Sequence, residues 1–296
     1  MRVLVVGKGA VGGYFGGRLH DSGADVTFLV RRKTDDLQVQ SVHGDMTLKI
    51  KSIVSGEQVE PFDLIIMSTK AYHLKQAIED IAPYVGENTT VLPLLNGYYH
   101  LAQLQERFPH VLGGLCFIES TIGPNGEIIQ TSKRHDIIFG EIDGQKSDKA
   151  QKISDLFSKA QFKSVLTDDV KTAMWNKYVF ITALSGITTI MYTSMGSIQE
   201  SPYGTELFRD LLAEINAVAE TEGVQVYSPE KNVEIATAMG PKMKASMLRD
   251  MEKGLPTEAD HLQGELMKLA EKHGISVPLL KMTYNRLRIY EVERLG

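Results

Sequence analysis

Short apolar runs alternate with amphipathic segments over the first half of the chain. Segments with helical spacing of apolar positions lie at Val11–Asp21, Leu74–Tyr84 and Leu101–Arg107. This alternation is typical of an α/β domain with a mainly parallel sheet. The apolar runs of strand length around these helices are Arg2–Val6, Asp25–Val30, Leu64–Ser68, Thr90–Leu95 and Val111–Ile118.

The pattern changes near Asp168. Before it, a glycine-containing turn at 123–126 and the segment Thr131–Glu141 predict a further pair of strands, and helix Ser147–Ala160 and strand Lys163–Leu166 complete the domain. After it, helical spacing dominates. We expect an α/β domain over residues 1–167 and an all-α domain over residues 168–296. The predicted helices of the second domain are Asp169–Ile190, Thr205–Glu222, Pro229–Lys253, Thr257–His273 and Leu279–Arg294.

Composition narrows the class of protein. The 296 residues carry a net charge of -5, which argues against nucleic acid as a partner. A single cysteine, Cys116, excludes an internal disulfide framework, and its apolar surroundings favour a buried residue over a nucleophile. No stretch approaches the roughly 18 apolar residues of a membrane span. The chain opens directly on a strand and leaves no room for a signal peptide, so we expect a cytoplasmic protein.

A glycine-rich motif follows the first strand and opens the first helix: Gly7, Lys8, Gly9, Ala10, Val11 and Gly12 form GxGxxG. In this strand–turn–helix context the motif predicts a Rossmann-type dinucleotide site. Gly7 would permit the tight turn, Gly9 would let the backbone approach the diphosphate, and Gly12 would let the helix pack on the strand. A plain βα turn is the less favoured interpretation. The N-terminal domain is therefore predicted to be of Rossmann type.

The end of the second strand favours NADP(H) over NAD(H). An NAD site usually has Asp or Glu at this position, to bind the ribose 2′-hydroxyl. Here the strand is followed by Arg31 and Arg32. A guanidinium can bind the 2′-phosphate of NADP in a bidentate manner, so Arg31 is the candidate ligand, while two solvated arginines are the alternative. Whether Arg32 assists is open.

Two polar residues stand where later strands end. Lys70 follows the strand ending near Ser68, and Asn96 follows Thr90–Leu95. Ligands of open α/β sheets bind beyond the carboxyl ends of the strands, which makes both residues candidates for cofactor or substrate contacts. Asn96-Gly97 could also be a simple turn, and Lys70 a solvated lysine.

A lysine interrupts an apolar helical face in the second domain. Lys177 shares that face with Val170, Met174, Ile181 and Leu184. Burying an ammonium is costly, so the side chain either extends to solvent or lines a cleft with a lowered pKa. In a cleft it could donate a proton to a developing alkoxide. The periodicity alone leaves both interpretations open.

Two further polar residues are candidates: Glu258 near a predicted helix start, and Ser246 within the predicted helix Pro229–Lys253. We expect Thr257 to be a helix N-cap and Glu258 to lie in the first turn, where a carboxylate is favourable. Glu258 also begins an apolar face through Leu262 and Leu266, which would direct it inward. Ser246 could bind a ligand or simply the backbone.

With these residues in view, the chain resembles the ketopantoate reductase (2-dehydropantoate 2-reductase) family over nearly its whole length. The resemblance implies a Rossmann-type domain, a helical domain, and an active site between them. The matching segments are GKGAVGG, STKAY at Lys70, LLNG ending at Gly97, AMWNK at Lys177, ASMLRD at Ser246, PTEADHLQGE at Glu258, and HGISVP.

The resemblance also implies roles for individual residues. Lys177 matches the general acid of the family, and Glu258 matches a glutamate that assists at the cofactor or the substrate. Lys70 and Asn96 match cofactor and active-site residues, and Ser246 matches a serine that binds the substrate carboxylate.

The chain departs from the family at the substrate. Family members carry asparagines four and eight residues after the catalytic lysine, where this chain has Ile181 and Ser185. They also carry a further substrate-binding asparagine, at a position that falls near Met195 in this chain. Losing amide partners should weaken recognition of a hydroxyl-bearing substrate.

We therefore expect NADPH-dependent reduction of 2-dehydropantoate to pantoate, a step of pantothenate biosynthesis, with no metal. Two alternatives remain: a related reductase acting on another small 2-oxo acid, and a non-catalytic NADP-sensing protein on the same fold. Apolar and Met-rich helix faces fit packing within one chain or a homodimer equally well.

Overall fold

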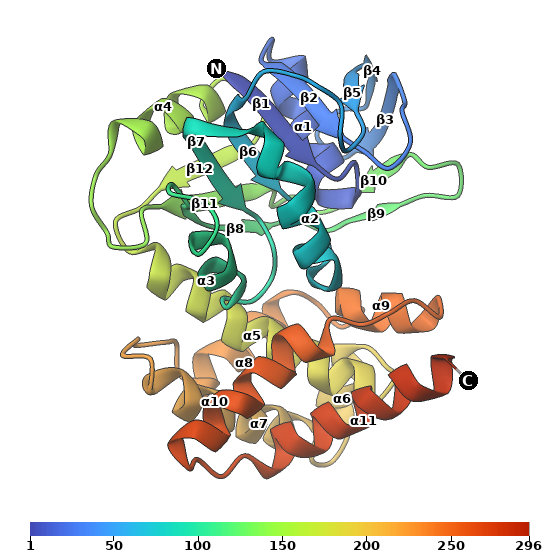
Figure 1. The fold of residues 1–296 in the computed structure, drawn as a ribbon. Coiled ribbons are helices and arrows are strands. Elements are labelled where there is room, and N and C mark those ends of the chain that lie inside the picture. The colour runs from blue at the N-terminus through green and yellow to red at the C-terminus, as the bar shows by residue number, and fades with distance from the viewer. Residues whose placement is uncertain (296) are drawn as a thin grey trace. The chain divides into compact units, whose positions relative to one another are not determined.

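The computed structural model describes residues 1–295, which fold into two compact units (Figure 1). The first unit consists of Met1–Asn96 and His100–Ala173, and the second of Gly97–Tyr99 and the chain from Met174 onward. All strands of the described residues lie in the first unit, and the second is helical. The predicted fold class is thus confirmed. The predicted boundary at 167/168 lies just ahead of the helix that runs from one unit into the other, and it stays a prediction.

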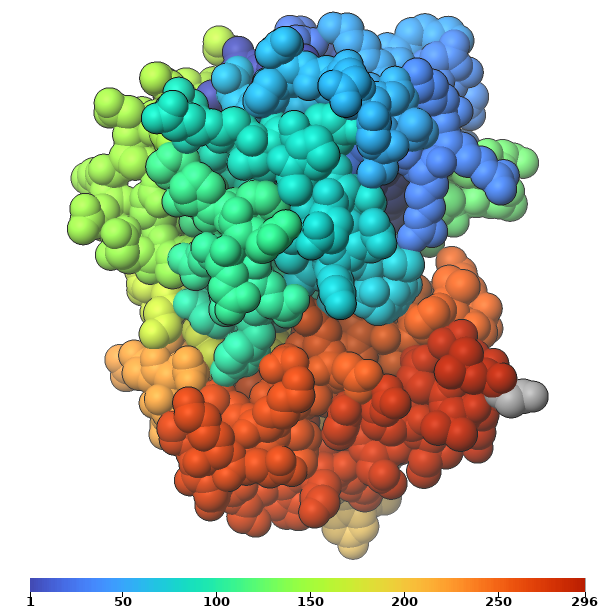
Figure 2. All heavy atoms as spheres, in the orientation of Figure 1, coloured from blue at the N-terminus to red at the C-terminus, as the bar shows by residue number. Residues whose placement is uncertain are grey.

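A five-stranded parallel sheet forms the centre of the first unit. Its order is β5-β2-β1-β6-β7, and each neighbouring pair is parallel. The central strands are almost wholly apolar because both of their faces are buried. On the face drawn in Figure 2 only small areas of the darkest blue N-terminal residues are visible, in keeping with the burial of Val3, Leu4 and Val5 of β1. The strands are β1 (Arg2–Val6), β2 (Asp25–Leu29), β5 (Lys51–Ile53), β6 (Phe62–Met67) and β7 (Val85–Pro93).

Two smaller sheets complete the first unit, with orders β4-β3-β10-β9 and β12-β11-β8. The sequence patterns missed β3, β4 and β5, because these strands are short and polar on one face. In β3, for example, only alternate residues such as Leu37 and Val39 are buried. The strands are β3 (Asp36–Ser41), β4 (Met46–Lys49), β8 (Gly113–Phe117), β9 (Ser120–Ile122), β10 (Ile128–Gln130), β11 (Asp136–Gly140) and β12 (Lys163–Leu166).

Helix α1 packs closely on the parallel sheet. A Cβ atom at Gly16 would lie 2.8 Å from the Phe28 ring, so glycine is needed for this close approach. Cys116 is buried in the same unit, as expected. The helices of the unit are α1 (Ala10–Asp21), η1 (Ala71–His73), α2 (Leu74–Ile81), η2 (Ala82–Tyr84), α3 (His100–Gln105) and α4 (Asp148–Phe157).

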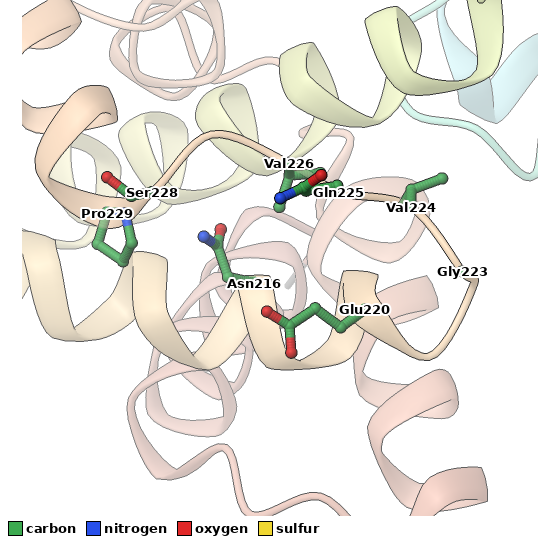
Figure 3. Close-up of a pocket in the computed structure, with 8 residues that line it drawn as sticks. All are labelled: Asn216, Glu220, Gly223, Val224, Gln225, Val226, Ser228 and Pro229. Carbon is green, nitrogen blue, oxygen red and sulfur yellow. The ribbon is translucent and has the colours of Figure 1, made fainter.

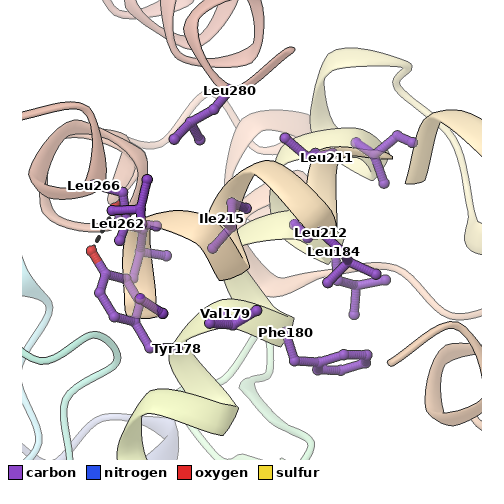
Figure 4. Close-up of a cluster of buried hydrophobic side chains, with 14 of the residues drawn as sticks. Tyr178, Val179, Phe180, Leu184, Leu211, Leu212, Ile215, Leu262, Leu266 and Leu280 are labelled. Carbon is purple, nitrogen blue, oxygen red and sulfur yellow. Dashed lines mark hydrogen bonds between the residues drawn. The ribbon is translucent and has the colours of Figure 1, made fainter. Parts of the chain in front are cut away.

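The second unit is built around α5 (Val170–Ile190), whose apolar residues form the core seen in Figure 4 with side chains of α7, η3, α10 and α11. Between Met174 and Thr189 only Asn176, Lys177 and Ile181 are not buried. The other helices are α6 (Met195–Glu200), α7 (Gly204–Glu220), α8 (Pro229–Ala238), α9 (Ser246–Glu252), the π-helical turn η3 (Asp260–Gly264), α10 (Glu265–His273) and α11 (Pro278–Leu295).

Two local predictions in the helical unit were wrong. The segment Pro229–Lys253 is two helices, α8 and α9, because Gly240 adopts a φ of +92° and Pro241 follows it. Thr257 is not an N-cap. Its backbone N–H and its hydroxyl both donate to Glu291 Oε1 of α11, each at 2.7 Å.

None of the helices in residues 1–295 combines the length and the apolar character needed to cross a bilayer.

Candidate functional site

The turn between β1 and α1 has the geometry that the glycine motif predicts. Gly7 adopts a φ of +92°, which a side chain would strain, and its N–H donates to Leu29 O at 3.1 Å. A Cβ at Gly12 would overlap both Ser68 Oγ and the carbonyl oxygen of Gly7. A Cβ at Gly9, in contrast, would meet nothing within 4 Å. Gly7 and Gly12 are therefore required by the fold, whereas Gly9 keeps open space beside the backbone.

The N-terminus of α1 suits an anion. The N-cap is Gly9, and the first turn of the helix contains no acidic residue. The unpaired N–H groups of a helix N-terminus and its positive dipole end favour phosphate. Lys8 Nζ is directed elsewhere, since it donates to Asp36 O at 2.9 Å, and Ala10 O accepts from Ser120 Oγ at 3.0 Å.

Arg31 follows β2 and pairs with a residue that the sequence patterns missed. Its Nη2 lies 2.8 Å from His73 Nε2, which belongs to η1. Partial burial and the nearby Arg31 charge lower the pKa of His73, so the neutral imidazole can accept this hydrogen bond at pH 7. The only sequence signal for His73 was its place three residues after Lys70.

Lys70 and Asn96 follow the ends of adjacent strands. Lys70 comes three residues after β6 and directly precedes η1, and Asn96 comes three residues after β7; both are partly buried. Gly97 then turns the chain with a φ of +87°. Because β2, β1, β6 and β7 are consecutive parallel strands, Arg31, the glycine turn, Lys70 and Asn96 all follow the same carboxyl edge of the sheet.

In the second unit, Lys177 and Ile181 are successive members of one narrow accessible face of α5. They are about one helical turn apart. Residues 178–180 between them and residues 182–189 after them are buried. Ser185, the next member, is only 4% exposed. Its Oγ accepts a hydrogen bond from Gln263 Nε2 at 3.2 Å, so its hydroxyl is already engaged within the protein.

Glu258 and Ser246 both precede or begin short helices of this unit. Glu258 is 8% exposed, and its carbonyl oxygen accepts from the N–H groups of His261 and Leu262, which starts the helical chain through η3. Ser246 is exposed and is the first residue of α9.

A cavity of about 540 Å³ lies elsewhere in the helical unit, beside the C-terminal end of α7 (Figure 3). Asn216 Nδ2 donates to Tyr227 O at 2.9 Å and fixes the loop over it. The predicted site residues do not line this cavity, whose lining is Asn216, Glu220, Gly223, Val224, Gln225, Val226, Ser228 and Pro229.

Comparison with known proteins identifies the family. The family model of ketopantoate reductase PanE/ApbA matches residues 3–144, and the model of its C-terminal part matches residues 169–291. The oxidoreductase YkpB of Bacillus subtilis (strain 168) is 40% identical over 99% of this chain and 100% of its own. The structure of 2-dehydropantoate 2-reductase from Geobacter metallireducens GS-15 superposes with a TM-score of 0.90, at 29% identity over 97% of this chain and 99% of the other.

Two more distant structures share the fold. A ternary structure of D-mandelate dehydrogenase with NADH and anilino(oxo)acetate has a TM-score of 0.91 at 22% identity, and covers 100% of both chains. The dimeric ketopantoate reductase from Staphylococcus aureus has a TM-score of 0.87 at 22% identity, over 99% of this chain and 100% of the other. The chain thus belongs to the ketopantoate reductase PanE/ApbA family and is an oxidoreductase of that family.

Proposed function

We propose that this protein reduces 2-dehydropantoate to pantoate with NADPH, and that Lys177 is the general acid. The observation that carries the proposal is the position of Lys177 on α5. It is an ammonium-bearing residue on the accessible face of a helix whose neighbouring residues are otherwise almost all buried. A partly desolvated lysine of this kind suits proton transfer to a carbonyl oxygen.

The first unit fits a phosphorylated dinucleotide. Gly7 and Gly12 shape the turn, Gly9 leaves room for a diphosphate, and Arg31 provides a guanidinium at the end of β2 for the 2′-phosphate. Lys70 and Asn96 follow the same sheet edge and would contact the ribose, the nicotinamide or the substrate. When bound, NADPH supplies a hydride to the carbonyl carbon of the 2-oxo acid.

Residues of the chain would stabilise the charge that develops on the carbonyl oxygen and supply the proton that neutralises it. As the carbonyl carbon gains the hydride, its oxygen becomes an alkoxide, and the Lys177 ammonium stabilises this charge and donates its proton. Glu258 would hold the cofactor or the substrate, and Ser246, exposed at the start of α9, would bind the substrate carboxylate. Lys177 recovers a proton from solvent after product leaves.

Ile181 favours a second candidate, the reduction of a 2-oxo acid with an apolar substituent. Its side chain shares the accessible face with Lys177, while the hydroxyl of Ser185 is engaged with Gln263. Neither is an obvious partner for the 4-hydroxyl group of 2-dehydropantoate. Comparing kcat/KM for 2-dehydropantoate with that for 3,3-dimethyl-2-oxobutanoate, which lacks only this hydroxyl, separates the two. A clear preference for the hydroxylated acid supports the first candidate, and equal or inverted values support the second.

The Lys177→Ala variant tests the catalytic assignment. We expect kcat to fall by about a hundredfold or more, the usual contribution of a general acid, with NADPH binding retained because the nucleotide turn lies in the other unit. Steady-state kinetics and fluorescence titration with NADPH measure the two quantities. The matched control is Lys171→Ala, six residues earlier on α5, which should keep wild-type turnover. Wild-type turnover in Lys177→Ala would contradict the proposed function.

We also propose that the protein forms a homodimer, since the Staphylococcus aureus relative is dimeric. Apolar side chains exposed on α11, such as Met282, Ile289 and Val292, give a surface that a second copy could cover.

A further inference from the structure

Three hydrogen bonds connect α5 to the π-helical turn η3. Tyr178 Oη donates to Leu262 O at 2.7 Å, drawn as a dashed line in Figure 4. Gln263 Nε2 donates to Thr182 O at 3.0 Å and to Ser185 Oγ at 3.2 Å. We refer to Tyr178, Thr182, Ser185 and Gln263 as the η3 clamp. The donors come from both elements: Tyr178 of α5 donates to η3, and Gln263 of η3 donates to two residues of α5.

The polar side chains of the η3 clamp are buried inside an apolar core. Tyr178, Thr182 and Gln263 are 0% exposed, and Leu184, Leu262 and Leu266 around them are all nearly fully buried. The other amide oxygen, Gln263 Oε1, has no hydrogen-bond partner within residues 1–295. A buried amide with an unpaired oxygen costs free energy that a methionine or leucine would avoid. Packing alone therefore does not account for a glutamine at this position.

The clamp also donates to the backbone of the π-helical turn. A turn of this kind departs from the regular pattern of α-helical backbone hydrogen bonds. The Tyr178 hydroxyl adds a side-chain donor to the Leu262 carbonyl group. On the other side, Gly186 lets α5 approach α11 closely, since a Cβ there would lie 2.8 Å from Thr283 Cγ2.

The clamp adjoins both proposed catalytic residues. Tyr178 directly follows Lys177 on α5, and η3 begins two residues after Glu258. On the other side of Glu258, Thr257 is held by Glu291 of α11. The backbone that carries Glu258 is thus fixed at Thr257 by α11, and at Leu262 and Gln263 by the helix that carries Lys177.

We propose that Tyr178 and Gln263 are positioning residues, which fix the rotation and the height of α5 against η3 and so hold the Lys177 ammonium in register with the Glu258 carboxylate. This inference rests on the proposed function of these two residues. Because side chains on a helix project in directions set by its rotation, a small turn of α5 about its axis would displace the Lys177 ammonium. Catalysis is sensitive to displacements of about 1 Å.

Tyr178→Phe and Gln263→Met remove the clamp donors with little change in volume. We expect kcat to fall by about tenfold to a hundredfold, with the KM for substrate and the Kd for NADPH changed by less than about threefold. The matched control is Tyr284→Phe. Tyr284 Oη donates to Asp260 Oδ1 at 2.7 Å, so this variant also removes one tyrosine hydroxyl bonded to η3, but from the α11 side. It should keep wild-type kcat.

A second measurement does not depend on turnover. The pH dependence of Lys177 acylation by acetic anhydride, followed by peptide mass spectrometry, reports the pKa of the lysine. We expect Tyr178→Phe and Gln263→Met each to shift this pKa by about half a pH unit or more, because the distance to neighbouring charge changes. Lys171, on the same helix, is the internal control and should not shift.

Unchanged kcat and unchanged Lys177 acylation in both variants would overturn the inference, as would an equal loss of kcat in Tyr284→Phe. Should either clamp variant fail to fold, melting curves would reveal it, and the remaining variant decides. These outcomes are separate from those of Lys177→Ala. Loss of activity in Lys177→Ala with wild-type behaviour of the clamp variants would leave the proposed function standing and remove only the clamp.

Discussion

In the proposed function, the preference for NADPH over NADH rests on Arg31. It lies at the end of β2, and its hydrogen bond to His73 directs the guanidinium while leaving the side chain exposed. A neutral His73 is the better partner for this purpose, because a protonated imidazole would repel the guanidinium. The lowered pKa of His73 keeps the pair in this state at neutral pH.

The Arg31→Ala variant should raise the KM for NADPH by about tenfold to a hundredfold, because charge-assisted hydrogen bonds to a phosphate contribute about 1.5–3 kcal/mol. The KM for NADH should stay nearly constant, since NADH has no 2′-phosphate. Kinetics with both cofactors give the comparison, and Arg32→Ala measured beside it shows whether the neighbouring arginine assists. Equal effects of Arg31→Ala on NADPH and NADH would exclude the 2′-phosphate role.

At the scale of elements, two glycines at the start of α1 differ in how much space surrounds them. At Gly12 a methyl group would collide with Ser68 and with backbone, and at Gly9 it would enter open space. Gly12 is therefore required for the packing of α1 against Ser68, which directly follows β6. Gly9 has no such packing requirement within the described chain, and we propose that it serves the cofactor.

The two alanine variants should therefore behave differently. Gly12→Ala should lower the free energy of unfolding by about 1–3 kcal/mol, the usual cost of overpacking. Gly9→Ala should keep the melting temperature of the wild type within a degree or two and weaken NADPH binding, because the added methyl group occupies the space beside the backbone. Thermal unfolding and NADPH titration test both. Wild-type NADPH affinity in Gly9→Ala would argue against a diphosphate at this turn.

At the scale of the whole molecule, each unit has a separate hydrophobic core. We expect two histidines of the first unit to make its stability depend on pH. The rings of His43 and His135 stack with their centroids 3.7 Å apart. Tyr14 Oη lies 2.7 Å from His135 Nδ1, and Arg18 and Asp136 are nearby charges. Burial lowers the pKa of His135, and the His43 and Arg18 charges add to the effect, against the opposing charge of Asp136.

The sign of the pH effect follows from linkage. His73 and His135 have folded-state pKa values below the ordinary 6.5, so the unfolded chain binds more protons as the pH falls through that value. The free energy of unfolding should therefore decrease from about pH 7 to pH 5. Urea unfolding over this range measures the slope. His135→Gln should make it shallower, and an unchanged slope in that variant would show that the stacked pair does not contribute.

The amino-acid sequence by itself determined the local and periodic features. The apolar runs of β1, β2, β6 and β7, the helix α5 and the glycine turn follow from hydrophobic periodicity and from backbone freedom, which are properties of neighbouring residues. The family was also predicted from the sequence, because several short motifs occur in one order, and the family models confirm it. Lys177 was singled out as a charge on an apolar face.

Only the tertiary structure decided what depends on residues distant in sequence. The hydroxyl of Thr257 binds Glu291 rather than capping a helix, because α11 brings a carboxylate to it. Strands such as β3 and β4 were missed because pairing partners, rather than their own weak pattern, stabilise them. His73 lies beside Arg31 because of the order of parallel strands. The pairing of Gln263 with Ser185 spans 78 residues, so the serine's buried setting was invisible to helical periodicity.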